Sequence, residues 1–195
     1  MKNRIITISR EFGSGGRTIG KLTAQKLSIP CYDHELIEKL SEKSGFDPKY
    51  VSEQSEYTIK SGLLSNMFSS SRPYGGLNNQ DYLWTIQRDI IIDIAQKESC
   101  VIVGRCADYI LKDIADCLNV FVHADIDFKA ERIVKIYGET SEKPEKRLID
   151  KDKRRAAYYN YYTDSQWAKI QNYHIALNSG KIGIEKCAEI ISSLY

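Results

Sequence analysis

The N-terminal stretch of the chain places a glycine-rich loop between an apolar run and an amphipathic segment. Residues 5–8 read Ile-Ile-Thr-Ile, three glycines fall within positions 13–16, and apolar residues then recur at helical spacing up to Leu27. A β-branched run favours a strand, and a 3.6-residue repeat favours a helix. Successive backbone N–H groups can converge in such a loop, and the N-terminus of the helix faces the same point. The stretch therefore predicts a phosphate-binding loop.

This loop matches part of the P-loop pattern G-x-x-x-x-G-K-[ST]. Aligned on residues 16–18, the pattern puts Glu11 at the first glycine, Arg17 at the lysine and Thr18 at the hydroxyl that holds Mg²⁺ in P-loops. An ordinary glycine-rich turn between strand and helix is the alternative, but the hydroxyl residues beside the glycines favour phosphate. The predicted phosphate-binding residues are Gly13, Ser14, Gly15, Gly16, Arg17 and Thr18, with Thr18 as the indirect magnesium ligand.

Composition limits the class of protein. A chain of 195 residues suits one domain, 1–195, with an inserted flap. The formal net charge of +2 gives no reason to expect a nucleic-acid polymer as partner. The five cysteines form no C-x-x-C pair and predict free thiols, mostly in the core. Because no apolar run approaches the length of about 20 residues that a membrane span needs, we expect a cytoplasmic protein without a membrane partner.

Strand and helix patterns alternate from one end of the chain to the other. After the first strand, apolar strands are predicted at residues 28–32, 99–103, 118–122 and 173–178. The intervening helices are predicted at 34–44, from a cap at Asp81, at 127–137, from Lys151 and at 184–194, with 138–150 as a polar connection. Asp33 ends the second strand, where it can cap a helix or face a ligand. The alternation predicts an α/β fold with a doubly wound, five-stranded parallel sheet.

With these features in view, the chain resembles the cytidylate-kinase-like branch of the P-loop nucleoside monophosphate kinases. In bacterial cytidylate kinases the loop reads G-P-S-G-S-G-K-G-T, whose threonine falls on Thr18 and whose lysine falls on Gly16. The resemblance implies a P-loop NTPase fold of the nucleoside monophosphate kinase type, ATP and Mg²⁺ as cofactors, and nucleotide substrates. Arg17, one residue after the usual lysine position, is then expected to present a cation to the phosphates.

The resemblance extends to the acceptor side of the site. The family's L-D-S-G falls on residues 32–35, which keeps Asp33, and the arginine six positions later falls on Lys39. The family's D-G-R-D falls on residues 103–106 and makes Arg105 the expected partner of the acceptor phosphate, through the two-pronged geometry of a guanidinium. A surface arginine at a strand end is the alternative interpretation of Arg105.

A basic segment further along carries the rest of the resemblance. The family's R-D-x-x-D-x-x-R-A is echoed at residues 148–156, where its second aspartate falls on Asp152 and its last arginine on Arg155. Lys129 and Arg132, on the preceding helix, are expected to face the lid. A basic helix can also be a solvated surface. The resemblance implies Arg17, Arg105, Arg132 and Arg155 as catalytic residues, and Asp33, Lys39, Arg105, Asp152 and Arg155 as acceptor-binding residues.

The implied function is ATP-dependent phosphoryl transfer to a nucleoside monophosphate, CMP or dCMP. Residues 45–80 are expected to form an acceptor-binding flap, and residues 138–163 a lid that closes over the substrates. One alternative is a kinase of another small metabolite, because the flap region resembles the family least. Another is a catalytically inactive, nucleotide-binding regulatory protein, because the P-loop lysine is missing. The sequence leaves the oligomeric state open.

Overall fold

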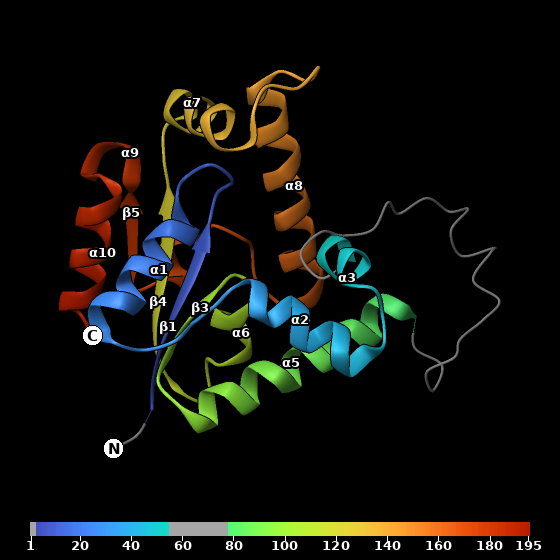
Figure 1. The fold of residues 1–195 in the computed structure, drawn as a ribbon. Coiled ribbons are helices and arrows are strands. Elements are labelled where there is room, and N and C mark those ends of the chain that lie inside the picture. The colour runs from blue at the N-terminus through green and yellow to red at the C-terminus, as the bar shows by residue number, and fades with distance from the viewer. Residues whose placement is uncertain (1–2, 55–77) are drawn as a thin grey trace.

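The computed structural model describes residues 3–54 and 78–195, and these residues build a five-stranded sheet (Figure 1). The strand order is β2-β3-β1-β4-β5, and every neighbouring pair is parallel. The strands are β1 (Arg4–Arg10), β2 (Cys31–Tyr32), β3 (Cys100–Val103), β4 (Asp116–His123) and β5 (Ile175–Asn178). The predicted doubly wound parallel sheet is confirmed. Its carboxyl ends share one edge, where ligands bind in open α/β sheets.

Helices connect the strands and cover both faces of the sheet. They are α1 (Gly16–Leu27), α2 (His34–Ser44), α3 (Pro48–Gln54), α5 (Asn79–Lys97), α6 (Ala107–Ile110), α7 (Ile126–Tyr137), α8 (Pro144–Tyr162), α9 (Ser179–Ile182) and α10 (Ile184–Ser193), with a 3₁₀ turn, η1, at Ile170–Asn172. None of the helices in the described ranges is long and apolar enough to cross a membrane.

The alternating side chains of the strands divide the core into two layers. On β1, Ile5 packs with the apolar faces of α2, α3 and α5, whereas Ile6 and Ile8 pack on the opposite face with α1 and α10. Successive residues of a strand point to opposite faces, and a sheet covered on both faces needs apolar residues throughout. All five cysteines are free, and Cys100 and Cys187 lie in these two core clusters.

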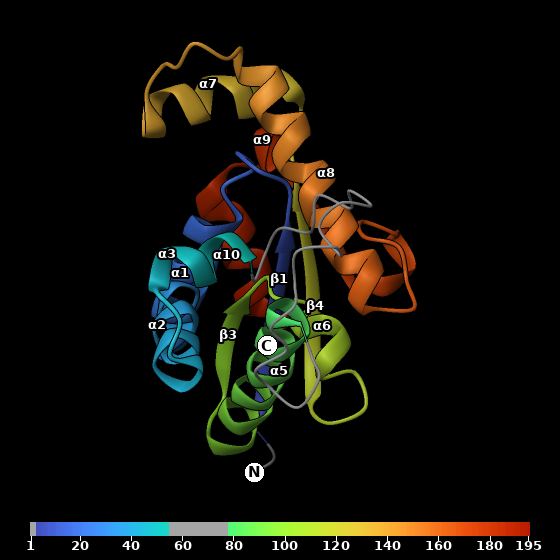
Figure 2. The same cartoon turned by 90° about the vertical axis from the view of Figure 1, so that its right-hand side faces the viewer.

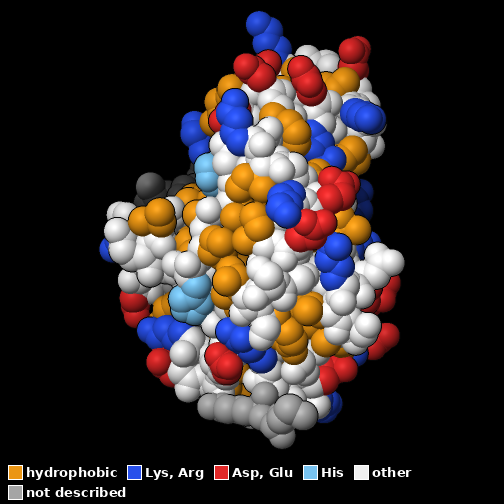
Figure 3. Space-filling view, turned by 90° about the vertical axis from the view of Figure 1, so that its left-hand side faces the viewer, with side chains coloured by type: hydrophobic (Ala, Val, Ile, Leu, Met, Phe, Trp, Pro, Cys, Tyr) orange, Lys and Arg blue, Asp and Glu red, His pale blue; other side chains and the backbone are white. Residues whose placement is uncertain are grey.

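Helices α7 and α8 extend beyond the carboxyl edge of the sheet, above the loop that follows β1 (Figure 2). A small apolar cluster of Ala130, Ile133 and Leu148 packs the two helices together, and Phe12 of the loop rests against it. The side of the molecule formed by α9 and α10 mixes apolar patches with charges of both signs (Figure 3). The arrangement puts two polar helices directly over the predicted phosphate-binding loop.

The predicted boundaries of four elements, α8, α5, β2 and β5, were wrong. Helix α8 begins at Pro144 rather than Lys151, because proline suits the first turn of a helix and the apolar face starts with buried Leu148. Helix α5 is capped by Asn78 rather than Asp81, and the Asn78 side chain accepts hydrogen bonds from the backbone N–H groups of Gln80 and Asp81. Strands β2 and β5 are shorter than predicted. Most of the expected flap, residues 55–77, lies outside the described residues.

Candidate active site

The loop between β1 and α1 has a backbone that requires glycine. Gly13 and Gly15 both have positive φ, at 83° and 82°. A Cβ on Gly13 would lie 3.0 Å from the backbone oxygen of Lys129, and one on Gly15 would lie 2.8 Å from the Ile184 Cδ1 atom. Any side chain at these positions would be strained and crowded. The glycines therefore let the loop pass closely under α7, with the N-terminus of α1 at its end.

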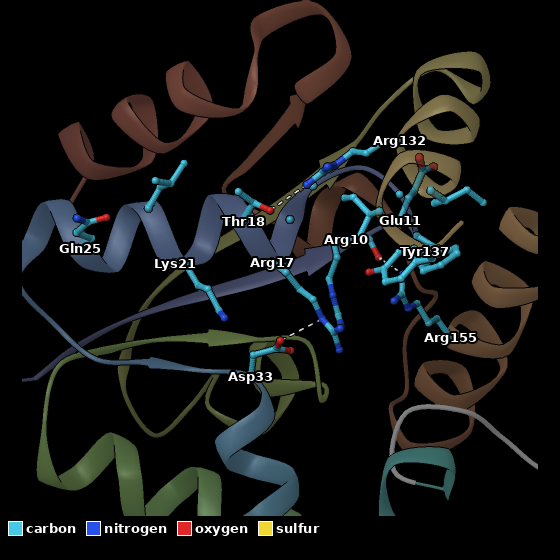
Figure 4. Close-up of a pocket in the computed structure, with 17 residues that line it drawn as sticks. Arg10, Glu11, Arg17, Thr18, Lys21, Gln25, Asp33, Arg132, Tyr137 and Arg155 are labelled. Atoms are coloured by element: carbon cyan, nitrogen blue, oxygen red, sulfur yellow. Dashed lines mark hydrogen bonds and ion pairs between the residues drawn. The ribbon is translucent and has the colours of Figure 1, made fainter. Parts of the chain in front are cut away.

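A cavity of about 330 Å³ opens beside this loop (Figure 4). This is the lower part of the size range of small-molecule sites. Its walls come from the loop, from α1, from the start of α2 and from α7 and α8. The lining residues are Arg10, Glu11, Phe12, Gly13, Gly15, Gly16, Arg17, Thr18, Lys21, Leu22, Gln25, Asp33, Arg132, Ile133, Ile136, Tyr137 and Arg155.

The cavity wall carries an excess of positive charge. Five of its lining residues are basic and two, Glu11 and Asp33, are acidic. The chain as a whole has a net charge of only +2, so the excess is local. A cleft lined by charges of one sign raises the local concentration of ligands of the opposite sign. The cavity is therefore suited to a polyanion.

The structure brings most of the predicted site residues to this cavity. Those that line it are Gly13, Gly15, Gly16, Arg17, Thr18, Asp33, Arg132 and Arg155. Ser14 is fully buried beneath the loop, where its hydroxyl donates to the backbone oxygen of Glu11 at 2.8 Å. Lys39 is exposed on α2 and is not among the lining residues. Ser14 thus supports the loop from below, and Lys39 lies away from the cavity.

Arg17 points across the cavity toward the second strand (Figure 4). Its Nε atom lies 3.0 Å from Oδ2 of Asp33, which is buried. Asp33 occupies the N-cap position of α2, but its side chain makes no capping hydrogen bond, contrary to one of the two predicted roles. The pair links the start of α1 to the carboxyl end of β2.

Thr18 lies at the other end of the cavity, under α7. Its hydroxyl accepts a hydrogen bond from Nη2 of Arg132 at 2.9 Å. Glu11 pairs with Lys129 of α7, with 2.7 Å between Oε2 and Nζ. Hydroxyl and carboxylate oxygens are hard ligands of the kind that Mg²⁺ prefers. The cavity wall thus offers oxygen atoms that fit a magnesium nucleotide, the Thr18 hydroxyl among them.

Helix α8 contacts the loop through Asp152 and Arg155. Oδ1 of Asp152 accepts hydrogen bonds from the backbone N–H of Phe12 at 2.7 Å and from Nη1 of Arg155 at 3.3 Å. Nη1 of Arg155 also donates to the backbone oxygen of Arg10 at 3.2 Å. Burial raises the pKa of Asp152 to about 6, although the Phe12 N–H and the charge of Arg155 act in the opposite direction. Asp152 itself is not among the residues that line the cavity.

Arg105 lies in a strained turn after β3. Gly104, Arg105 and Cys106 all have positive φ, at 77°, 61° and 54°. The left-handed region is unfavourable for residues other than glycine, and such strain tends to occur at functional sites. The turn leads into α6, whose buried Asp108 accepts a hydrogen bond from the Tyr159 hydroxyl at 2.7 Å. Contacts with α8 thus accompany the unusual backbone at Arg105.

A smaller cavity adjoins the first one at this turn. Its lining residues include three arginines, Arg10, Arg105 and Arg155, and no acidic residue. Each of the three arginines is at most 8 % exposed. Arg10 and Arg155 line both cavities. The two cavities thus share part of their walls, with the loop in one wall and Arg105 in the other.

The sequence prediction missed Arg10, Glu11 and Lys21. Glu11 is only a mismatch to the P-loop pattern, and no predicted role falls on Arg10. Lys21 follows Arg17 by one helical turn on α1, and this spacing is a signal that was available. Lys129, predicted to face the lid, is instead buried against the loop, where it pairs with Glu11. Contacts between distant elements decide these roles.

Comparison with known proteins identifies the class of protein to which this fold belongs. Shikimate kinase from Acinetobacter baumannii, solved with shikimate, aligns with the chain at a TM-score of 0.55 and 15% identity. The alignment covers 98% of this chain and 92% of the shikimate kinase, so the fold is that of P-loop phosphotransferases. The model of the cytidylate kinase-like family matches residues 5–181. The chain belongs to the cytidylate kinase-like family.

Two relatives are more similar in sequence. A cytidylate kinase from Archaeoglobus fulgidus is 28% identical over 193 residues, which cover 95% of this chain and 91% of the relative. A crystal structure of an uncharacterized protein from Eubacterium ventriosum is 27% identical, covers 98% of both chains and aligns at a TM-score of 0.74. A kinase family and a phosphotransferase fold are thus established, whereas the acceptor substrate is not specified at these identities.

Proposed function

We propose that the protein catalyses ATP-dependent transfer of a phosphoryl group to a nucleoside monophosphate, CMP or dCMP. The observation that carries the proposal is a pair of adjoining basic cavities. One contains the glycine loop and the N-terminus of α1, and the other contains Arg105 at the carboxyl end of β3. A reaction between two phosphorylated substrates needs two neighbouring anion sites. The similarity to a cytidylate kinase supports the choice of acceptor.

On the donor side, ATP occupies the larger cavity with its phosphates at the loop. The backbone of Gly13–Thr18 and the positive end of α1 bind the phosphate oxygens. Mg²⁺, when bound, would offset the charge of the phosphates. Thr18 would hold the ion indirectly through its hydroxyl, which Arg132 would then leave to contact the phosphates.

On the acceptor side, Arg105 binds the phosphate of the monophosphate. A guanidinium makes two parallel hydrogen bonds to phosphate, which fix its orientation as well as its position. Asp33, on the wall of the larger cavity, contacts the remainder of the acceptor, and Asp152 acts from behind the wall by positioning Arg155. An oxygen of the acceptor phosphate forms a bond to the γ-phosphorus while the bond from that phosphorus to the oxygen of ADP breaks. Phosphoryl transfer of this kind needs positioning and positive charge more than covalent chemistry.

The residues expected to close the site are the flap at 45–80 and the lid at 138–163. Helix α8, which belongs to the lid, already touches the loop through Asp152 and Arg155. Closure of both segments over the substrates would exclude water and so suppress hydrolysis of ATP.

The test is a coupled assay for ADP release. Purified protein receives MgATP together with CMP, dCMP, UMP, AMP or GMP in turn. We expect release with CMP or dCMP, and release with none of the five would contradict the proposal. Arg105→Met should raise KM for the acceptor and leave the calorimetric Kd for MgATP unchanged, which separates the acceptor site from the donor site.

Two other functions remain as candidates. A kinase of another small metabolite is favoured by the departure from the family pattern at Lys39, which is exposed and away from the cavity. Thermal-shift screening of phosphorylated and hydroxylated acceptors would reveal it, because a ligand that binds the folded state raises Tm.

An inactive regulatory protein is favoured by the absence of the P-loop lysine. Tight calorimetric binding of ATP with no transfer in single-turnover experiments would establish that function instead.

A further inference from the structure

We propose that Arg10 replaces the missing P-loop lysine, reaching the transferred phosphoryl group from the end of β1 instead of from the start of α1. The inference rests on the proposed phosphoryl transfer. It assigns a catalytic role to a residue that no sequence pattern indicates, because the P-loop pattern has glycine where this chain has Arg10. With the lysine of G-x-x-x-x-G-K set at position 16, the first glycine of the pattern falls on position 10. The chain thus has arginine and glycine where the pattern has glycine and lysine.

The two exchanged positions touch each other. A Cβ on Gly16 would lie 2.6 Å from Cβ of Arg10 and 2.9 Å from its Cγ. Gly16 begins helix α1 and does not have a positive φ, so its backbone would accept another residue. The Arg10 side chain thus fills the space that the Cβ of a lysine at position 16 would need. This contact explains why position 16 is a glycine.

The far end of the Arg10 side chain meets a second glycine. A Cβ on Gly104 would overlap Nη1 of Arg10 and would lie 2.9 Å from its Cζ. Gly104 follows β3 directly and precedes Arg105. The Arg10 side chain thus extends from the loop of the donor site to the turn of the acceptor site. Its rigid start requires glycine at position 16, and at position 104 the positive φ of 77° also favours glycine.

This course puts the guanidinium where the two substrates meet. Arg10 lines both cavities and is only 6 % exposed. Figure 4 shows its side chain running from the loop toward the part of the site that contains Asp33. The backbone oxygen of Arg10 accepts a hydrogen bond from Arg155 at 3.2 Å, which fixes the start of the side chain. A guanidinium so placed can contact the phosphoryl group both before and after it is transferred.

The role proposed for Arg10 is electrostatic stabilisation of the phosphoryl group during its transfer. The bond from the γ-phosphorus to ADP breaks as the bond to the acceptor oxygen forms, and negative charge spreads over the three other oxygens of the group. Arg10 forms no covalent bond and exchanges no proton, because a guanidinium stays charged in proteins. Loss of one preorganised donor of this kind lowers turnover about a hundredfold or more. Arg17, which pairs with Asp33, is left to orient the acceptor side of the site.

The first experiment replaces Arg10 by methionine, which keeps length and removes charge. We expect Arg10→Met to lower kcat about a hundredfold, and to weaken calorimetric binding of MgATP by a smaller factor. Arg88→Met, at an exposed position of α5, is the matched control and should leave both values unchanged. An Arg10→Met enzyme with the kcat of the wild type would overturn the inference. A wild-type protein without transfer activity would instead contradict the proposed function, and MgATP affinity would still decide whether Arg10 contacts the phosphates.

The second experiment tests the exchange of positions by a double-mutant cycle. Gly16→Lys alone should lower Tm, because the new Cβ would clash with the Arg10 side chain. Arg10→Gly should relieve this overlap, so the double variant Arg10→Gly/Gly16→Lys should have a higher Tm than the sum of the single changes allows. It should also regain part of the kcat lost in Arg10→Gly. Additive changes in Tm, or a double variant no more active than Arg10→Gly, would count against the replacement.

Discussion

The loop at residues 10–18 and the helices above it, α7 and α8, are held in place by different kinds of contact. The loop rests on the core: Ser14 is fully buried, and its backbone oxygen accepts a hydrogen bond from the Ser179 hydroxyl at 2.6 Å. The helices contact the loop through Phe12, which packs on their apolar cluster, and over the cavity through polar groups, with Asp152 on the N–H of Phe12 and Arg132 on the hydroxyl of Thr18.

This difference divides the site into two parts. The fixed part is the loop at residues 10–18, and the exchangeable part is formed by the polar contacts of α7 and α8 with that loop. Close packing tolerates little change, because interiors are as dense as crystals. Hydrogen bonds between charged groups and the loop can be exchanged for bonds to a bound phosphate at little net cost, since the number of bonds is preserved. The Phe12 N–H and the Thr18 hydroxyl are also groups that a phosphate or its Mg²⁺ would use. The helices can therefore yield to a ligand while the loop keeps its shape.

The largest effect should come from a change in the fixed part. Gly13→Ala imposes a left-handed alanine, which costs about 1–2 kcal/mol, and crowds the backbone of α7, which adds roughly 1–3 kcal/mol. We expect urea unfolding to show a loss of about 3 kcal/mol in the free energy of unfolding.

Gly45→Ala is the matched control for Gly13→Ala. Gly45 also has a positive φ, at 72°, but among the described residues no atom other than those of its chain neighbours lies within 4 Å of an added Cβ. Only the cost of the backbone conformation applies there, so the difference between the two variants measures the contact of the loop with α7. Equal losses in the two variants would mean that α7 moves away freely, and the distinction between fixed and exchangeable parts would fail.

The same distinction explains how far the sequence could predict this molecule. The strands followed from their apolar runs, and Arg17, Thr18, Asp33 and Arg155 were expected at the site because each lies at the end of a strand or on a recognisable pattern. Arg10 was missed, because its role depends on two glycines that are 6 and 94 residues away in the chain. Such packing between distant segments leaves no local pattern.

Boundaries failed for a related reason. The start of α8 depends on the packing of Leu148 against α7 and Phe12. The cap of α5 depends on which of several neighbouring polar side chains reaches the end of the helix. Lys39 was placed by counting along the family pattern, but helix α2 turns it to solvent. The sequence therefore predicts elements and strand ends better than the direction in which a helical side chain points.

The second prediction concerns pH and the contact between α8 and the loop. Burial raises the pKa of Asp152 to about 6, from 3.8. The folded state then binds a proton more tightly than the unfolded state, so the stability contribution of this group is complete below pH 4 and is lost as pH rises through 6. The loss is at most about 3 kcal/mol by the size of the shift. Asp152→Asn should remove this dependence and make the protein more stable than the wild type at pH 8.

The measurement is urea unfolding from pH 4 to pH 8, taken as the difference between wild type and Asp152→Asn. The difference matters because the pKa of the buried Asp108 is also raised and contributes the same sign to both proteins. Arg155, Lys129 and Glu11 surround Asp152 and also remain in both. A difference that stays constant with pH would show that the Asp152 carboxylate is well solvated, and that α8 is not closed on the loop.

The smallest effect should come from Arg132, the contact of α7 with the Thr18 hydroxyl. Arg132→Met removes one partly exposed cation from the edge of the cavity and leaves the apolar contacts of α7 intact. We expect a decrease in kcat of about tenfold, equivalent to about 1.4 kcal/mol, with little change in Tm. Lys135→Met, one helical turn away on the exposed face of α7, is the control and should change neither value.

If Arg132→Met raises kcat instead, then Arg132 holds the Thr18 hydroxyl away from Mg²⁺, and α7 restrains the site rather than completing it. A lower Tm in Arg132→Met would place Arg132 with the fixed contacts, and the boundary between the two parts would shift to include the first turns of α7.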